Sequence, residues 1–243
     1  RGKNEKAIKV INDAIVIPRI KETDKALCKL LLGDIYVFQD EVWEATLLYG
    51  QVNQDFKNDP IGSQAKLKSA KAYYYTGNFD WAKTQLDVLK GATTKLIAND
   101  ALKLSVLISD NLGMDTSTVA LEMYARADLW QFQGNLDTAL FQLYQLIGSF
   151  PDHLSLLDDA HYLKAKIYSK QQKWELATKE LEKVIAFNDL LVDDALLDLA
   201  KIYQEILGDD VNALKYYEQI VLDHPSSVYA VEARKHYRKL RGF

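Results

Sequence analysis

Apolar residues recur at intervals of three and four along most of the chain, the spacing that marks one face of an α-helix. The clearest stretch contains Leu96, Ile97, Ala101, Leu104, Ile108 and Leu112. All four prolines, Pro18, Pro60, Pro151 and Pro225, fall between such stretches, where they cannot interrupt a helix. The pattern predicts an all-α fold with about thirteen helices and no strand.

The helical pattern is itself repeated. Each copy carries a small residue, an aromatic residue three positions later, and an alanine nine or ten positions after that. The small residues are Gly33, Ala70, Ala127, Ala165 and Ala200; the aromatic residues are Tyr36, Tyr73, Trp130, Tyr168 and Tyr203; the alanines are Ala45, Ala82, Ala139, Ala177 and Ala213. The copies are 37, 57, 38 and about 36 residues apart, and the last has one residue inserted near Gly208. Five copies are therefore predicted.

The small residues have a direct physical meaning. A small side chain on the first helix of a copy and an alanine on the second allow the two helices to approach closely. The sequence therefore predicts that both sets of small residues are buried where paired helices pack.

This pattern resembles the tetratricopeptide repeat, a unit of about 34 residues with a small residue and a Tyr on its first helix and an Ala on its second. The resemblance covers nearly the whole chain. It implies a right-handed superhelical α-solenoid of antiparallel helix pairs.

The repeat frame divides the chain into five segments. We expect the second helix of a truncated repeat plus a linker in residues 1–22, two repeats in 23–93, an inserted helix in 94–114, three repeats in 115–225, and a capping helix in 226–243. The inserted helix accounts for the wide 57-residue interval. The first helix of the leading repeat is missing and the sequence starts without Met, so we interpret the chain as a C-terminal piece of a longer protein.

Composition narrows the classes of partner. The 30 basic and 34 acidic residues give a net charge of -4 and are interspersed, which provides no electrostatic footprint for nucleic acid or anionic lipid. No apolar run reaches the ~18 to 20 residues of a transmembrane helix. Cys28 is the only cysteine, so an internal disulfide is excluded. A protein or peptide partner is expected, and the oligomeric state stays open.

Sequence motifs for enzyme chemistry are missing, including the phosphate-binding, dinucleotide-binding and zinc-protease patterns. The nearest approach to a site is the group His153, Asp158, Asp159 and His161. Asp158 and Asp159 are expected in the first turn of a helix, where carboxylates favour the free amides, so we favour a structural role over a metal site. We therefore predict no catalytic residue, no metal and no cofactor.

The resemblance also implies a binding groove lined by the first helix of each repeat. The family's groove positions correspond to Asp34, Val37, Phe38, Lys71, Tyr74, Tyr75, Asp128, Gln131 and Phe132, and further along to Lys166, Lys170 and Lys201. Acidic residues at Asp34 and Asp128 disfavour the carboxylate clamp with which some family members hold a C-terminal tail. The first three copies give an aromatic groove and the last two a charged one.

These observations favour a non-catalytic scaffold that binds a partner peptide or helix in the concave groove. Two alternatives remain: a peptidoglycan- or glycan-associated binding module, and an accessory domain fused to an N-terminal enzyme. The segment from Pro225 to Gly242 is similar to the closing segment of bacterial envelope tetratricopeptide proteins, which implies a periplasmic or outer-membrane-associated location.

Overall fold

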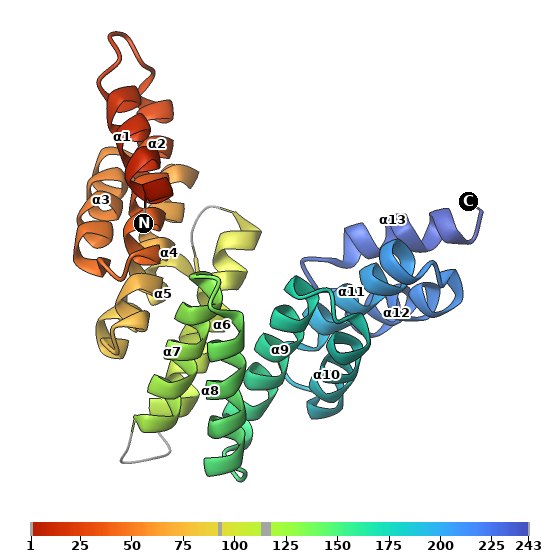
Figure 1. Cartoon of the computed structure of the whole chain (residues 1–243). Helices are drawn as coiled ribbons and strands as arrows, with labels where there is room; N and C mark the ends of the chain where they lie inside the picture. The colour runs from red at the N-terminus through yellow and green to blue at the C-terminus, as the bar shows by residue number, and fades with distance from the viewer. Residues whose placement is uncertain (1, 92–93, 113–117, 243) are drawn as a thin grey trace. The chain divides into compact units, whose positions relative to one another are not determined.

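A computed structural model describes residues 2–91, 94–112 and 118–242, and within these ranges every regular element is helical. The described residues form thirteen α-helices, which Figure 1 labels, and one π-helical segment, η1. Their bounds are α1 Gly2–Ile15, α2 Glu22–Phe38, α3 Val42–Asp55, α4 Pro60–Tyr75, α5 Phe79–Leu89, α6 Lys95–Leu112, α7 Val119–Phe132, α8 Leu136–Ser149, α9 Leu154–Lys170, α10 Trp174–Phe187, α11 Val192–Lys201, η1 Ile202–Leu207, α12 Asp210–Asp223 and α13 Ala230–Leu240. The all-α prediction is confirmed.

The helices form two compact units, residues 1–135 and residues 136–243. In the first unit each helix from α1 to α6 packs on the next, and α4 also contacts α2 on one side and α7 on the other. In the second unit each helix from α8 to α12 packs on the next. The first helices of the first three predicted repeats, α2, α4 and α7, therefore lie side by side in one unit.

The predicted small residues are buried in every copy. Gly33 and the four alanines in equivalent positions are buried, and the five second-helix alanines, Ala45, Ala82, Ala139, Ala177 and Ala213, have no exposed surface at all. All ten small residues are thus buried, as a close approach of paired helices requires.

A common turn follows the first helix of each copy. In four copies the backbone N–H five residues after the motif aromatic donates to that aromatic's carbonyl: Glu41 to Tyr36, Asn78 to Tyr73, Asn135 to Trp130 and Lys173 to Tyr168. The residue before each donor has a positive φ. This is the Schellman arrangement that ends a helix with one left-handed residue.

The corresponding turn of the fifth copy contains one additional residue. Asp209 N donates to Tyr203 O, one residue further along the chain than in the other copies, and Gly208 takes the left-handed position. The extra residue is absorbed in η1, where the helix widens. A single inserted residue is the usual origin of such a π-helical bulge, and the sequence showed this insertion near Gly208.

The wide interval in the repeat frame contains one helix, α6, which packs against α5, α4 and α7. Residues 113 and 114 of the expected inserted segment lie outside the described residues. Helices α1 and α13 lie where the truncated repeat and the capping helix are expected. The division into repeats itself stays a prediction.

Hydrogen bonds about one repeat length apart connect neighbouring copies in the second unit. The Tyr162 hydroxyl donates to Asp198, 36 residues on, at 3.0 Å, and the Tyr229 hydroxyl donates to Asp194, 35 residues back, at 2.8 Å. Such bonds fix the register of successive repeats, because each repeat contacts only its neighbours.

Among the described residues, no helix combines the length and apolar content of a membrane span.

Candidate partner-binding surface

Three helices of the first unit present matching pairs of side chains. Each pair is four residues apart on its helix and so points to the same side. The pairs are Asp34 and Phe38 on α2, Lys71 and Tyr75 on α4, and Asp128 and Phe132 on α7. We call these six residues the α2–α4–α7 surface.

The charged members of this surface are held in ion pairs. Lys68 Nζ lies 2.8 Å from both carboxylate oxygens of Asp34, which also accepts a hydrogen bond from the Tyr49 hydroxyl at 2.7 Å. Lys71 Nζ lies 3.5 Å from Asp128. The carboxylates are therefore compensated, and the surface offers no excess of either charge.

Tyr75 is the buried aromatic member of the surface. Its ring centroid lies 6.4 Å from that of Phe132, and Lys71 Nζ lies 5.6 Å from the centre of the Tyr75 ring. Burial raises the pKa of Tyr75 well above its usual value, and the nearby carboxylates of Asp128 and Asp34 raise it further. Tyr75 therefore stays neutral and acts as a packed aromatic support.

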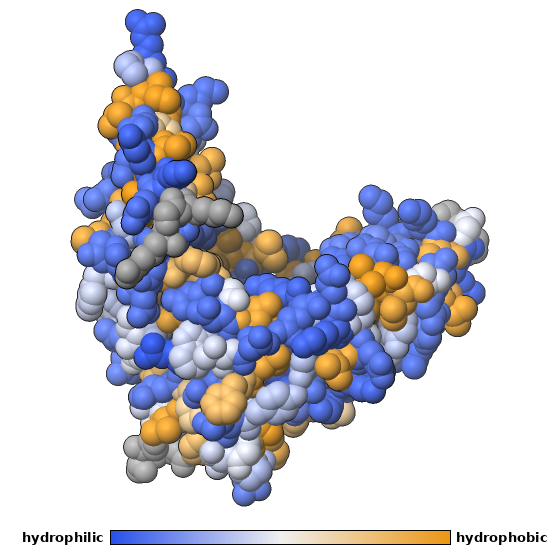
Figure 2. Space-filling model, viewed as in Figure 1, coloured by the Kyte–Doolittle hydropathy of each residue, from blue (hydrophilic) through white to orange (hydrophobic). Residues whose placement is uncertain are grey.

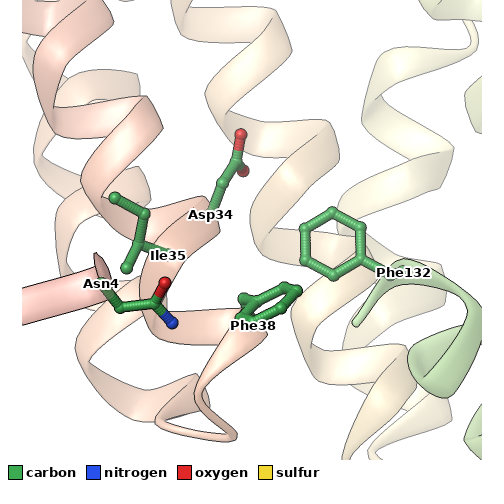
Figure 3. A pocket seen from close by; sticks show the side chains of 5 residues that line it. All are labelled: Asn4, Asp34, Ile35, Phe38 and Phe132. Atoms are coloured by element: carbon green, nitrogen blue, oxygen red, sulfur yellow. The ribbon is translucent and has the colours of Figure 1, made fainter. Parts of the chain in front are cut away.

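The two phenylalanines remain accessible. Phe38 is 45% exposed and Phe132 is 38% exposed. Together with Asn4, Asp34 and Ile35 they line a pocket of about 270 Å³. Figure 3 shows both aromatic rings at this space, with the Asn4 amide from α1 approaching Phe38 and the Asp34 carboxylate on the other side. The pocket is apolar with polar groups at its edges.

Three of the expected groove residues, Val37, Tyr74 and Tyr75, are buried instead. Val37 and Tyr74 lie in the core, and Tyr74 packs against Tyr75 and Phe79 with ring centroids 5.6 and 5.8 Å apart. Val37 stands four residues after Gly33, and Tyr74 four residues after Ala70. A residue four positions after a buried one shares its helix face, so neither side chain can reach a partner. The expectation that Val37 and Tyr74 contact a partner is therefore corrected.

The expected groove residues elsewhere have varied surroundings. Gln131 is half-buried on α7. In the second unit, Lys166 is exposed and lies 4.3 Å from the Tyr162 ring centre, Lys170 is exposed, and Lys201 pairs with Glu232 of α13 at 2.8 Å. The Lys201 charge is thus compensated by a carboxylate of α13. A role for these residues in partner binding stays a prediction.

The second unit also contains a buried ionic cluster that the sequence analysis missed. The Glu180 carboxylate is hydrogen-bonded to His161 Nδ1 at 2.5 Å and accepts from Lys164 at 3.0 Å and Lys183 at 3.1 Å. Burial alone would raise the pKa of Glu180, but these hydrogen bonds and the Lys164 charge lower it to about 2. Lys164 itself is buried. In the sequence, the one indication of this cluster is that Lys164 stands among the apolar residues Leu163, Ala165 and Ile167.

The helix-start interpretation of Asp158 and Asp159 is wrong. Helix α9 begins at Leu154, which places both aspartates in its second turn. Asp158 is buried, and burial raises its pKa. Within the described residues, no group of three or more His, Cys, Asp or Glu side chains is arranged to hold a metal ion.

Comparison with known proteins bears on the repeat frame. Residues 194–227 match the family model of the tetratricopeptide repeat. This segment runs from α11 through η1 and α12 to the loop before α13, which is the fifth copy of the pattern. No curated protein sequence matches the chain. The fifth copy thus matches a tetratricopeptide repeat. Tetratricopeptide repeats generally serve as protein-interaction scaffolds and usually lack catalytic activity.

Proposed function

We propose that this chain is a non-catalytic scaffold that binds a segment of a partner protein on the α2–α4–α7 surface. The observation that carries the proposal is the pocket of about 270 Å³ between Phe38 and Phe132. Exposed aromatic side chains give large contact area at a low cost in ordering, which is why they are enriched at interaction sites.

The size of the pocket favours a side chain over a metabolite. Pockets for small molecules usually measure ~300 to 1,000 Å³, and this one lies below that range. It suits one apolar side chain of a partner segment, with the rest of the segment lying along the surface.

The electrostatics favour an apolar anchor. Asp34 is neutralised by Lys68, and Asp128 by Lys71. A charged side chain in the pocket would lose its hydration without gaining a free counter-charge. We therefore expect a Leu, Ile, Met or Phe at the anchoring position of the partner.

Hydrogen bonds between helices hold the surface together, which supports binding. The Asp34 carboxylate is fixed from two helices, by Tyr49 of α3 and Lys68 of α4. The side-chain amide of Gln133 donates to the Val37 carbonyl at 3.4 Å and so connects the end of α7 to α2. A preorganised surface loses little conformational entropy when a partner binds.

A location in a bacterial envelope remains a prediction from the C-terminal resemblance.

Affinity capture from an extract of the source organism tests this proposal. The bait is compared with Phe38→Ala, Phe132→Ala and the double variant; the exposed Phe141 of α8 supplies the control variant Phe141→Ala. We expect the double variant to lose its partners while the control keeps them. Recovery of the same partners at the same yield by a folded double variant would exclude this surface.

A further inference from the structure

A second aromatic surface lies away from the α2–α4–α7 surface, on helices α3, α4 and α5. The Tyr73 ring centroid lies 6.3 Å from the Trp43 ring and 6.3 Å from the Trp81 ring, with interplanar angles of 82° and 86°. We call these three residues the tryptophan patch. Trp43 is 68% exposed and Trp81 is 50% exposed.

Packing alone does not account for this patch. Edge-to-face ring pairs stabilise by only ~0.5 to 1.5 kcal/mol beyond the area that they bury, and here both indole rings leave half or more of their surface in water. Leu47, one turn after Trp43 on α3, and Val88 on α5 are exposed as well. Gathered exposed apolar side chains of this kind mark interaction sites.

The patch is held in a fixed position. Tyr73 is the motif aromatic of its repeat, and its carbonyl accepts the turn hydrogen bonds from Thr76 N at 3.2 Å and Asn78 N at 3.0 Å. The two tryptophans stand at the beginning of α3 and α5, immediately after the equivalent turns of two successive repeats. The backbone turn that follows Tyr73 is thus held by hydrogen bonds.

The charged residues that directly flank the two tryptophans in the sequence are negative, and the nearest cation, Lys83, pairs with Asp87. Asp40, Glu41 and Glu44 flank Trp43, and Asp80 precedes Trp81; all four side chains are exposed. In the part of the chain that the structure describes, no cation pairs with any of these four carboxylates. The sequence contains no Lys or Arg between Lys29 and Lys57, nor between Lys71 and Lys83.

Carboxylates in the first turn of a helix also favour its free amides, so these acidic residues would carry no inference by themselves. Here the acidic residues stand beside exposed indole and phenol rings, and the two kinds of group together favour a cation. A guanidinium group stacks on aromatic faces and pairs with carboxylates, and Arg does this better than Lys because its charge is planar and weakly hydrated.

We infer that the tryptophan patch binds an arginine-containing basic segment of a partner protein. The guanidinium stacks against Trp43, Tyr73 or Trp81, and the flanking carboxylates supply the counter-charge. This site lies at the beginning of the second helices α3 and α5 and at the end of the first helix α4. It is independent of the pocket at Phe38 and Phe132.

Fluorescence anisotropy of labelled hexa-arginine on the full chain at low salt tests the inference. Trp43→Ala and Trp81→Ala are each expected to weaken binding about 2- to 30-fold, the range that corresponds to the loss of one cation–π contact. Because both rings are largely exposed, the variants keep the fold, which circular dichroism checks. Phe141→Ala and the double variant Phe38→Ala/Phe132→Ala are the controls and should bind as the unmodified chain does.

The charge contribution is tested with Glu44→Gln/Asp80→Asn, against Asp13→Asn/Asp152→Asn as a control with the same change of net charge. We expect the first variant to bind more weakly and to depend less on salt, because it lacks counter-charges at the site. Equal loss in both charge variants would identify general electrostatic attraction and overturn the inference. So would unchanged binding by the two tryptophan variants, or binding of chitohexaose but not of hexa-arginine, which would identify a glycan site.

Discussion

Gly33 on α2 lies directly against the ring of Tyr49 on α3: a Cβ atom at position 33 would lie 2.5 Å from Cε1 of Tyr49 and 2.8 Å from its Cζ. Tyr49 cannot move aside easily, because its ring is buried and its hydroxyl is hydrogen-bonded to Asp34. The small position of this repeat therefore has to be glycine, whereas the other copies accept alanine.

Gly33→Ala should lower the free energy of unfolding by about 1 to 3 kcal/mol, the usual cost of overfilling a packed contact. Gly50→Ala on α3 is the matched control, since a Cβ at position 50 meets nothing within 4 Å. It should raise stability by roughly 0.5 to 1 kcal/mol through helix propensity. Urea unfolding of both variants checks this pair, and an unchanged midpoint for Gly33→Ala would contradict the contact.

Ala177→Leu should also destabilise by about 1 to 3 kcal/mol, because Ala177 is completely buried in α10. Ala186 lies on the same helix and is exposed. Ala186→Leu is therefore expected to leave the melting temperature nearly unchanged. Equal melting temperatures for the two variants would mean that the repeat frame is shifted in the second unit.

The left-handed turn position gives a reciprocal pair of variants. Gly77 has φ +77° with open space around a Cβ, so Gly77→Ala should cost about 1 kcal/mol through backbone strain alone. Gln172 occupies the same position with φ 58°. Gln172→Gly should therefore raise the free energy of unfolding, by up to about 1 kcal/mol. Thermal unfolding measures both, and destabilisation by both would contradict a shared left-handed turn.

Acid should weaken the second unit through Glu180. Its pKa falls from 4.5 to about 2 on folding. The folded state therefore binds fewer protons than the unfolded state between these values, and the stabilisation is complete above pH ~4.5 and is lost as the pH falls towards ~2. The effect is on the order of 3 kcal/mol.

Glu180→Gln should remove this acid-dependent contribution and reduce stability at neutral pH, since it leaves the buried Lys164 without its carboxylate. Glu175 on the same helix pairs with Lys179 in full exposure, so Glu175→Gln should keep the pH profile of the unmodified chain. The test is the free energy of unfolding measured from pH 7 to pH 2. The same acid slope in Glu180→Gln and in the unmodified chain would argue against the cluster.

Much of the fold could be predicted from the sequence because repetition multiplies each weak signal. One small residue means little, but Gly33 and four alanines in equivalent positions indicate a common close contact. The turn was only partly visible, since glycine marks the left-handed position at Gly77, Gly134 and Gly208, whereas Asp40 and Gln172 give no such signal.

The candidate site was predicted less completely, because exposure depends on neighbouring helices. Phe38 and Phe132 are accessible as expected, whereas Tyr74 faces the core. Tyr75 is buried as well, and of the three consecutive tyrosines only Tyr73 is partly exposed. Identical neighbouring side chains gave no sequence signal of this difference. The tryptophan patch was missed because its rings come from three different helices.

The central claim is that a partner segment lies on the α2–α4–α7 surface, and site-specific photo-crosslinking tests it most directly. A photoreactive phenylalanine analogue is placed at position 38, 132 or 141, and the chain is irradiated in extract of the source organism. Our account predicts the same partner adduct from positions 38 and 132 and none from position 141. A partner that is captured by the chain but crosslinks only from position 141 would contradict it.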